Sequence, residues 1–107
     1  MTTYDKREQA FESAFVHDEE LRFRAHARRD HSLGLWAAAL LGKSGEDAED
    51  YAATIVALGL EPAPNEAVKA RIIADFVKHN VHQSVEQIDS TMAAMMKDAV
   101  EHIKMEP

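Results

Sequence analysis

The sequence contains no cysteine, and it also lacks any long apolar run. The absence of cysteine excludes a disulfide scaffold, a thiolate zinc site and a cysteine nucleophile, and it fits a reducing cytoplasm. No apolar run approaches the roughly 20 residues that a membrane-spanning helix needs, and the opening MTTYDKREQ has no apolar stretch behind its charges. We therefore expect a soluble, unprocessed protein with no membrane insertion.

The sequence also lacks an excess of basic residues, since its net charge is −7. The charge is uneven: residues 1–29 hold six basic and six acidic side chains, so the remaining 78 residues carry the whole deficit. Nucleic-acid binding draws most of its affinity from a basic surface that releases counterions. The acidic body of this chain argues against a nucleic-acid partner.

The motifs of common enzymes are absent as well. The sequence has no glycine-rich phosphate loop and no serine in a nucleophile elbow, and nothing in it places a pair of carboxylates on facing helices. We therefore predict a protein that is not an enzyme and that uses no cofactor.

What the sequence does contain is helical periodicity. Its 107 residues, 46% of them hydrophobic, are enough for one domain with a core. Apolar residues recur every three or four positions over 33–41, 51–58, 68–77 and 85–103, which is typical of core-facing helices. Loops of two to six residues would make neighbouring helices antiparallel. The pattern predicts an all-α four-helix bundle with Trp36, Tyr51, Ile55, Ile72, Phe76, Ile88, Met92 and Met95 among its buried residues.

Capping signals mark the ends of these helices. Gly42 is expected to end the first helix, and Ser44 to open the second. Asn65 is a candidate N-cap for the third helix, whose apolar stripe includes Val77. Ser84 and Gln87 form the pattern of a capping box for the last helix, whose stripe begins at Val85.

Two clusters allow a sharper interpretation. Met92, Met95 and Met96 could form an adaptable groove or a soft ligand set, but their spacing favours the core. His79 and His82 lie three residues apart, and no third ligand has suitable spacing. Solvated or capping histidines are therefore favoured over a zinc site.

The first thirty residues do not follow the core pattern. Phe11 and Phe15 share one helical face, but that face continues into Asp18, Glu19 and Arg22. The residue types still favour a helix, so we expect one long helix over 18–42 whose early turns are solvated.

The aromatic residues of this region need a separate explanation. Phe11, Phe15 and Phe23 are more aromatic surface than a solvated tail requires, and aromatics beside arginines are favoured interface anchors. We predict a flexible, disordered segment over residues 1–18 that orders on a partner, followed by the bundle over 19–107.

The order of short motifs resembles a known family. KREQA at 6–10 followed by EELRFRAHARR at 19–29 is similar to the inhibitory segment of the mitochondrial ATPase inhibitor protein. Over nearly its whole length, including HDEE, GLWAA and LLG, the chain resembles the zeta subunit of the alphaproteobacterial F-type ATP synthase, an inhibitor of its ATPase activity.

The resemblance implies a mechanism and a set of contacts. The N-terminal segment would insert as a helix between a catalytic beta subunit and its alpha neighbour, reach the gamma rotor and block the rotation that hydrolysis drives. The resemblance also implies a location in the cytoplasm, at the cytoplasmic face of the inner membrane. The residues that the resemblance and the aromatic pattern assign to the partner are Lys6, Arg7, Glu8, Gln9, Ala10, Phe11, Phe15, Glu19, Glu20, Phe23, Arg24, Ala25, Ala27 and Arg28.

This sequence departs from the mitochondrial pattern in two places, and other functions stay open. Arg22 stands where the mitochondrial segment has tyrosine, and FESAFVHD at 11–18 separates motifs that are adjacent there.

The chief alternative is a general helical adaptor that binds partners through the bundle. A small-ligand carrier or enzyme would need a polar cluster inside the core, which the apolar stripes do not supply.

Overall fold

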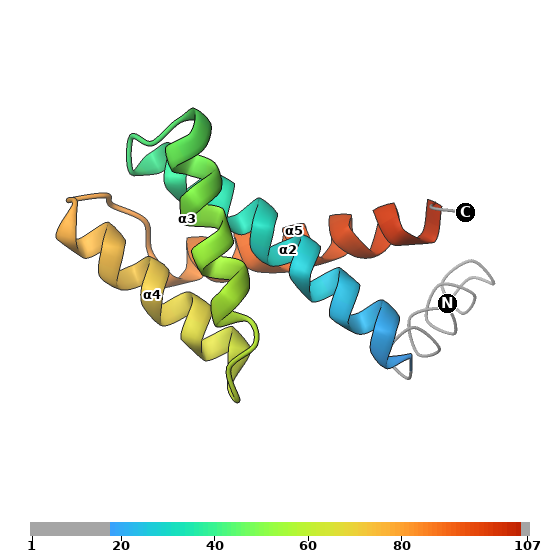
Figure 1. The fold of residues 1–107 in the computed structure, drawn as a ribbon. Coiled ribbons are helices and arrows are strands. Elements are labelled where there is room, and N and C mark those ends of the chain that lie inside the picture. The colour runs from blue at the N-terminus through green and yellow to red at the C-terminus, as the bar shows by residue number, and fades with distance from the viewer. Residues whose placement is uncertain (1–17, 106–107) are drawn as a thin grey trace.

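The structure, a computed structural model, describes residues 18–105, and within that range it consists of helices joined by short loops, with no strand. Four helices follow one another: α2 (Glu19–Leu40), α3 (Gly45–Leu58), α4 (Pro64–Lys78) and α5 (Val85–Met105) (Figure 1). The prediction of an all-α fold with four helices is thereby confirmed. The predicted disordered segment lies outside the described residues, except for Asp18.

Local side-chain and backbone contacts explain where the helices begin and end. Asp18 is the N-cap of α2, and its carboxylate accepts a hydrogen bond from the Leu21 amide at 3.1 Å. After α2, Gly42 adopts a positive φ of 81°, which glycine tolerates without strain. The predicted capping box is confirmed: the Ser84 amide donates to Gln87 Oε1 at 2.7 Å, and the Gln87 amide donates to Ser84 Oγ at 3.0 Å.

The start of the third helix differs from the prediction. Pro64 is the first residue of α4 and Ala63 its N-cap, so the assignment of Asn65 as the cap is wrong. Proline is well suited to this position because its fixed φ is helical and it has no amide hydrogen to leave unsatisfied. The Asn65 side chain instead accepts a hydrogen bond from Arg29 Nη2 of α2 at 2.8 Å.

The main core joins all four helices. Trp36 packs edge-on against Phe76, with 5.7 Å between ring centroids. Trp36 and Met95 are only half-buried, however, so their prediction as buried residues is wrong. The residues that form this core are Leu33, Ala37, Ala38, Tyr51, Ile55, Val68, Ile72, Phe76, Ile88 and Met92.

The buried stripes of α4 and α5 are narrower than the sequence suggested. Val77 is 74% exposed and Val85 46% exposed, although both were expected to continue an apolar stripe. Val77 lies one position beyond Phe76, and Ile73, one beyond Ile72, is already half-buried. Helix α4 therefore contacts the core over a small arc, and residues one step around the helix reach solvent.

Helices α2 and α3 approach each other closely at Gly34. A Cβ atom at this position would lie 2.6 Å from the Ala52 Cα atom and 3.0 Å from its Cβ atom. Ala52 is completely buried. The glycine inside α2 is therefore required by the packing of two helix backbones rather than by a turn.

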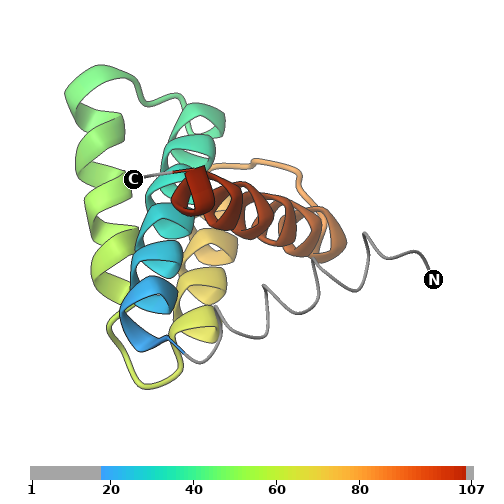
Figure 2. The same ribbon diagram turned by 90° about the vertical axis from the view of Figure 1, so that its right-hand side faces the viewer.

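Helix α5 extends the fold beyond the main core. Figures 1 and 2 show α5 crossing α2, and Figure 1 shows the C-terminal half of α5 diverging from the N-terminal half of α2 beyond that crossing. Ala25 and Ile103 are the buried residues of this second, smaller core, with Leu21, Met96 and Val100 packed around them. Within residues 18–105, no helix is long and apolar enough to cross a membrane.

This second core corrects the prediction that the early turns of α2 are solvated. Ala25, Arg29 and Asp30 are 1%, 4% and 1% exposed, respectively. The early turns are therefore solvated on one side only, because α5 covers the other side.

Candidate functional site

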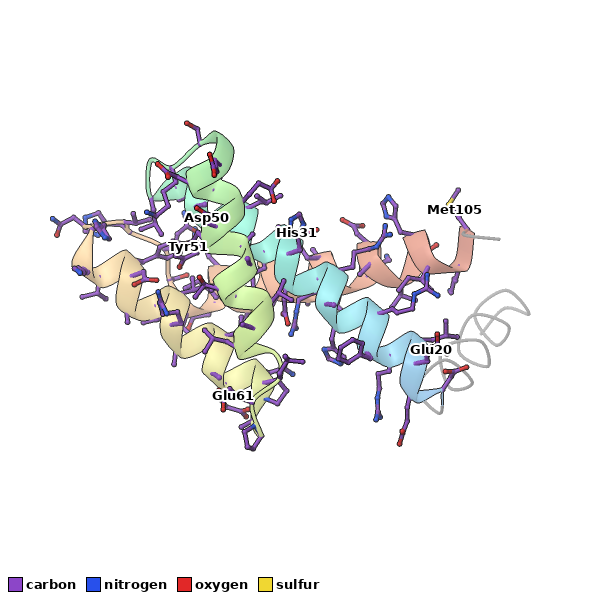
Figure 3. The ribbon with its side chains drawn as sticks, viewed as in Figure 1. Glu20, His31, Asp50, Tyr51, Glu61 and Met105 are labelled. Atoms are coloured by element: carbon purple, nitrogen blue, oxygen red, sulfur yellow. The ribbon has the colours of Figure 1, made fainter. Side chains whose placement is uncertain are left out.

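The first candidate surface is the outer face of α2, which we define as Glu20, Phe23, Arg24 and Ala27. These positions follow the i, i+3, i+4, i+7 spacing and therefore share one side of the helix. Phe23 is 59% exposed, Glu20 and Arg24 are exposed, and Ala27 is half-buried. Glu20 marks the start of this face, at the end of α2 that lies farthest from the α2–α3 loop (Figure 3). An exposed phenylalanine between charged residues is the composition expected of an interface.

The remaining predicted contacts have different environments. Glu19 is exposed in the first turn of α2, and Arg28 is exposed beside a shallow hollow of about 270 Å³ that Met95 and His102 also line. Ala25 is 1% exposed and packs with Ile103 of α5, so it offers almost no surface to a partner. The other predicted contact residues lie outside the described part of the chain: Lys6, Arg7, Glu8, Gln9, Ala10, Phe11 and Phe15.

The second candidate surface is a groove of about 570 Å³ between α2, α4 and α5, which we call the α2–α4–α5 groove. Its floor is apolar and comes from Ala25 of α2 and from Met92, Ala93, Met96 and Val100 of α5. Its rim is charged and carries Arg22, His26 and Arg29 from α2, Asn65, Glu66 and Lys69 from α4, and Asp89 from α5. Lys69 Nζ and Asp89 Oδ1 form an ion pair at 2.7 Å, which joins α4 to α5 across the groove.

His26 is the titratable group that the groove affects most. Its Nδ1 atom is buried and has no hydrogen-bond partner among the described residues. Burial lowers the pKa of His26 below its ordinary value, and the neighbouring Arg29 guanidinium lowers it further. The ring is therefore held in its neutral form near neutral pH.

A buried polar network lies beside the groove. Arg29 Nε donates to Asp30 Oδ1 at 2.7 Å, and Arg29 Nη2 donates to Asn65 Oδ1, so the network ties α2 to α4. Burial raises the pKa of Asp30, and the adjacent guanidinium opposes that rise. A Cβ atom on Gly59 would collide with Asp30 Oδ2, so the carboxylate also packs against the end of α3.

Sequence reasoning missed this network. Ala25, Arg29 and Leu33 stand four residues apart, so they continue the buried stripe of α2 towards its N-terminus. The arginine in the middle of that stripe hid the periodicity, because charged residues are almost never fully buried unless they are paired.

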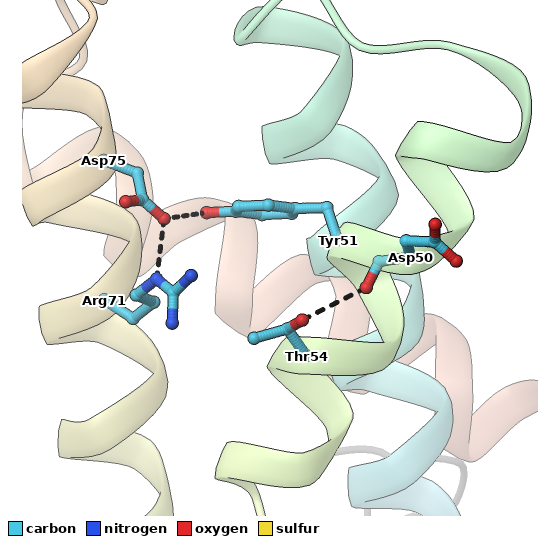
Figure 4. A network of polar contacts seen from close by, with 5 residues as sticks. All are labelled: Asp50, Tyr51, Thr54, Arg71 and Asp75. Atoms are coloured by element: carbon cyan, nitrogen blue, oxygen red, sulfur yellow. Dashed lines mark hydrogen bonds and ion pairs between the residues drawn. The ribbon is translucent and has the colours of Figure 1, made fainter.

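A second polar contact joins α3 to α4 at the edge of the main core (Figure 4). The Tyr51 hydroxyl donates to Asp75 Oδ2 at 2.8 Å, and Arg71 Nε donates to the same oxygen at 2.9 Å. Burial and the hydrogen bond to Asp75 raise the pKa of Tyr51. The phenol therefore stays protonated and acts as a donor that holds α3 against α4.

The two candidate surfaces offer contacts to a partner. Across residues 18–105, no group of three histidine, aspartate or glutamate side chains is arranged to hold a metal ion. No curated protein sequence matches the chain significantly. A family model described as ATPase inhibitor subunit zeta matches residues 1–102, which include both surfaces and the segment that precedes α2. The chain therefore belongs to the ATPase inhibitor subunit zeta family.

Proposed function

We propose that this protein inhibits ATP hydrolysis by an F-type ATP synthase by inserting residues 1–18 as a helix into a catalytic alpha/beta interface. The observation that carries the proposal is the family match over residues 1–102, which includes the whole N-terminal segment. In this proposal the segment reaches the gamma rotor, and the bundle remains outside the cleft. The protein would then act at the cytoplasmic face of the membrane that holds the synthase.

The geometry of α2 supports a binding surface that continues from the N-terminal segment. The outer face presents Phe23 and Arg24 within two turns of Asp18. An exposed arginine can bind a partner carboxylate through two parallel hydrogen bonds, and an aromatic ring beside it can fill an apolar pocket. The outer face would therefore contact the mouth of the cleft while the segment enters it.

Insertion as a helix has a local cost at Asp18. This residue caps α2 with an extended backbone, at φ −96° and ψ 105°, so the helix begins after it. Extending α2 towards residue 1 would require Asp18 to become helical and to lose its cap, at about 1 kcal/mol. Contacts with the partner must offset that loss.

The larger cost is conformational entropy. Ordering about 17 residues costs roughly 1–2 kcal/mol each. Burying Phe11, Phe15 and Phe23 contributes roughly 1.5–3 kcal/mol apiece, which does not offset the ordering cost. The balance requires an extensive interface with charge-assisted hydrogen bonds, and a deep cleft between two subunits supplies more of these than a flat surface does.

The test measures ATP hydrolysis by purified catalytic heads of the synthase. A chain that begins at Asp18 should still show helical circular dichroism and a cooperative thermal melt, because the four helices that the structure describes and both cores lie within residues 18–105. It should nevertheless lose most of the inhibition.

Two variants of the full chain sharpen the test. The double substitution Phe11→Ala and Phe15→Ala should also reduce inhibition, through lost apolar contact. The matched control is Val77→Ala, which removes an apolar side chain that is 74% exposed on α4, and it should inhibit normally. Full inhibition by the truncated chain would overturn the proposal and favour an adaptor that binds through the bundle.

A further inference from the structure

The α2–α4–α5 groove combines an apolar floor with a charged rim, and the outer face of α2 lies on a different side of that helix. We propose that residues 1–17 of the same chain dock in this groove through Phe11 and Phe15, so that the inhibitory segment is held away from the synthase until the groove is vacated. This inference rests on the proposed function and adds regulation to it.

The position of Asp18 gives the segment access to the groove. Asp18 is the N-cap of α2 and has an extended backbone, so the helix begins after it. Arg22, the first groove residue, follows four residues later, and Arg22 to Arg29 spans about 10 Å at 1.5 Å per helical residue. Phe15 is three residues before Asp18, which allows a reach of about 10 Å. The distance is therefore compatible with docking.

The sequence of the segment fits the chemistry of the groove. Glu8, Phe11, Glu12 and Phe15 follow the i, i+3, i+4, i+7 spacing, so in a helix they share one face with two rings and two carboxylates. The rings match the floor, because the methionine sulfurs of Met92 and Met96 form favourable contacts with aromatic side chains. The carboxylates match Arg22, which is the exposed basic residue that α2 contributes to the groove.

Docking would weaken inhibition without changing any contact with the synthase. If only a fraction of the chains has an undocked segment, the apparent dissociation constant rises by the reciprocal of that fraction. A change that blocks the groove should therefore make the protein a stronger inhibitor. A change that merely damages the fold would make it a weaker one.

Two neighbouring alanines provide a matched pair of variants. Both are exposed on α5, but Ala93 lines the groove and Ala94 does not. Each has one aspartate four residues away, Asp89 or Asp98, so a new glutamate meets a similar local charge at either position. We therefore compare Ala93→Glu with Ala94→Glu, both in the full chain.

The direct measurement is NMR of ¹³C-methyl-labelled methionine. Met92 and Met96 line the groove, and Met95 lies outside it as an internal reference. Ala93→Glu, and separately Phe11→Ala with Phe15→Ala, should shift the Met92 and Met96 methyl signals and leave that of Met95 in place. Ala94→Glu should leave all three unchanged. Unchanged signals in the phenylalanine variant would overturn the inference, and so would wild-type signals that change on dilution, which would indicate a second copy in the groove.

Inhibition separates this inference from the proposed function. Ala93→Glu should inhibit hydrolysis at a several-fold lower concentration than Ala94→Glu, and equal potency would overturn the regulatory role. If the phenylalanine variant loses inhibition while Met92 and Met96 keep their wild-type signals, docking is wrong and the proposed function stands. If those signals move but a chain that begins at Asp18 still inhibits fully, the proposed function is wrong and the docking contact stands.

Discussion

Replacing Arg29 by methionine tests the buried network between α2 and α4. Methionine keeps the length and apolar stem of the side chain but removes the guanidinium that pairs with Asp30 and donates to Asn65. Asp30 is 1% exposed, so its carboxylate would lose its charged partner inside the protein. Breaking a buried ion pair on one side costs about 3–5 kcal/mol. That is a large part of the 5–15 kcal/mol by which a typical domain is stable.

The stability lost in the Arg29→Met variant should depend on pH, in a direction that follows from the pKa of Asp30. Burial raises this pKa above its ordinary value of 3.8, and Arg29 opposes the rise. Without Arg29 the folded-state pKa rises further. A carboxyl whose pKa is raised on folding stabilises the fold below its unfolded pKa and loses that contribution as pH rises through its folded pKa. The Arg29→Met variant should therefore be damaged most at neutral pH and less at acid pH.

The assay is urea unfolding followed by circular dichroism at pH 7.5 and pH 5. Adding Asp30→Asn to Arg29→Met removes the uncompensated charge and should recover part of the stability at pH 7.5. Arg71→Met is the control, since Arg71 pairs with Asp75 at the surface and should contribute no more than about 1 kcal/mol. A loss below about 1 kcal/mol at both pH values in Arg29→Met would refute this account of the network.

Two further predictions concern the helix crossing and the groove. Gly34→Ala should lower the melting temperature, because overpacking against the Ala52 backbone costs about 1–3 kcal/mol and outweighs the roughly 1 kcal/mol gained in helix propensity; an unchanged or higher melting temperature would show that α3 yields easily. His26 has a pKa lowered by burial and by Arg29, so its contribution to stability is present above the unfolded pKa of 6.5 and lost as pH falls below it. The wild-type melting temperature should therefore fall more between pH 7.5 and pH 5.5 than that of His26→Gln, and parallel curves would contradict the assignment.

The sequence predicted those features that arise within one helix. Four apolar stripes predicted four helices, and the Ser84 and Gln87 capping box was correct because its two hydrogen bonds join residues three positions apart. Features that depend on a neighbouring helix were not predictable in the same way. Asn65 was mistaken for a cap because its actual partner, Arg29, is 36 residues away in the chain.

Burial in the first half of α2 also depends on a neighbouring helix, and the sequence pattern did not predict it. A helix with arginine at its buried positions has almost no apolar periodicity there, so local pattern alone indicates a solvated stretch. The burial of Ala25 depends on α5, which returns from the other end of the chain to cover it. The predicted contact surface was therefore drawn on all sides of α2, although only some of those residues are accessible.

The two sides of α2 have different roles in this structure. Ala25 and Arg29 face α5 and α4, where they hold the fold together, whereas Phe23 and Arg24 face solvent. A motif that matches an inhibitory helix in sequence thus divides into residues that position the helix and residues that a partner can reach. Because α5 and the Arg29 network fix the rotation of α2 about its axis, they also fix the direction in which Phe23 and Arg24 point. In the proposed mode of inhibition, the bundle would therefore set which face of the helix follows the N-terminal segment towards its partner.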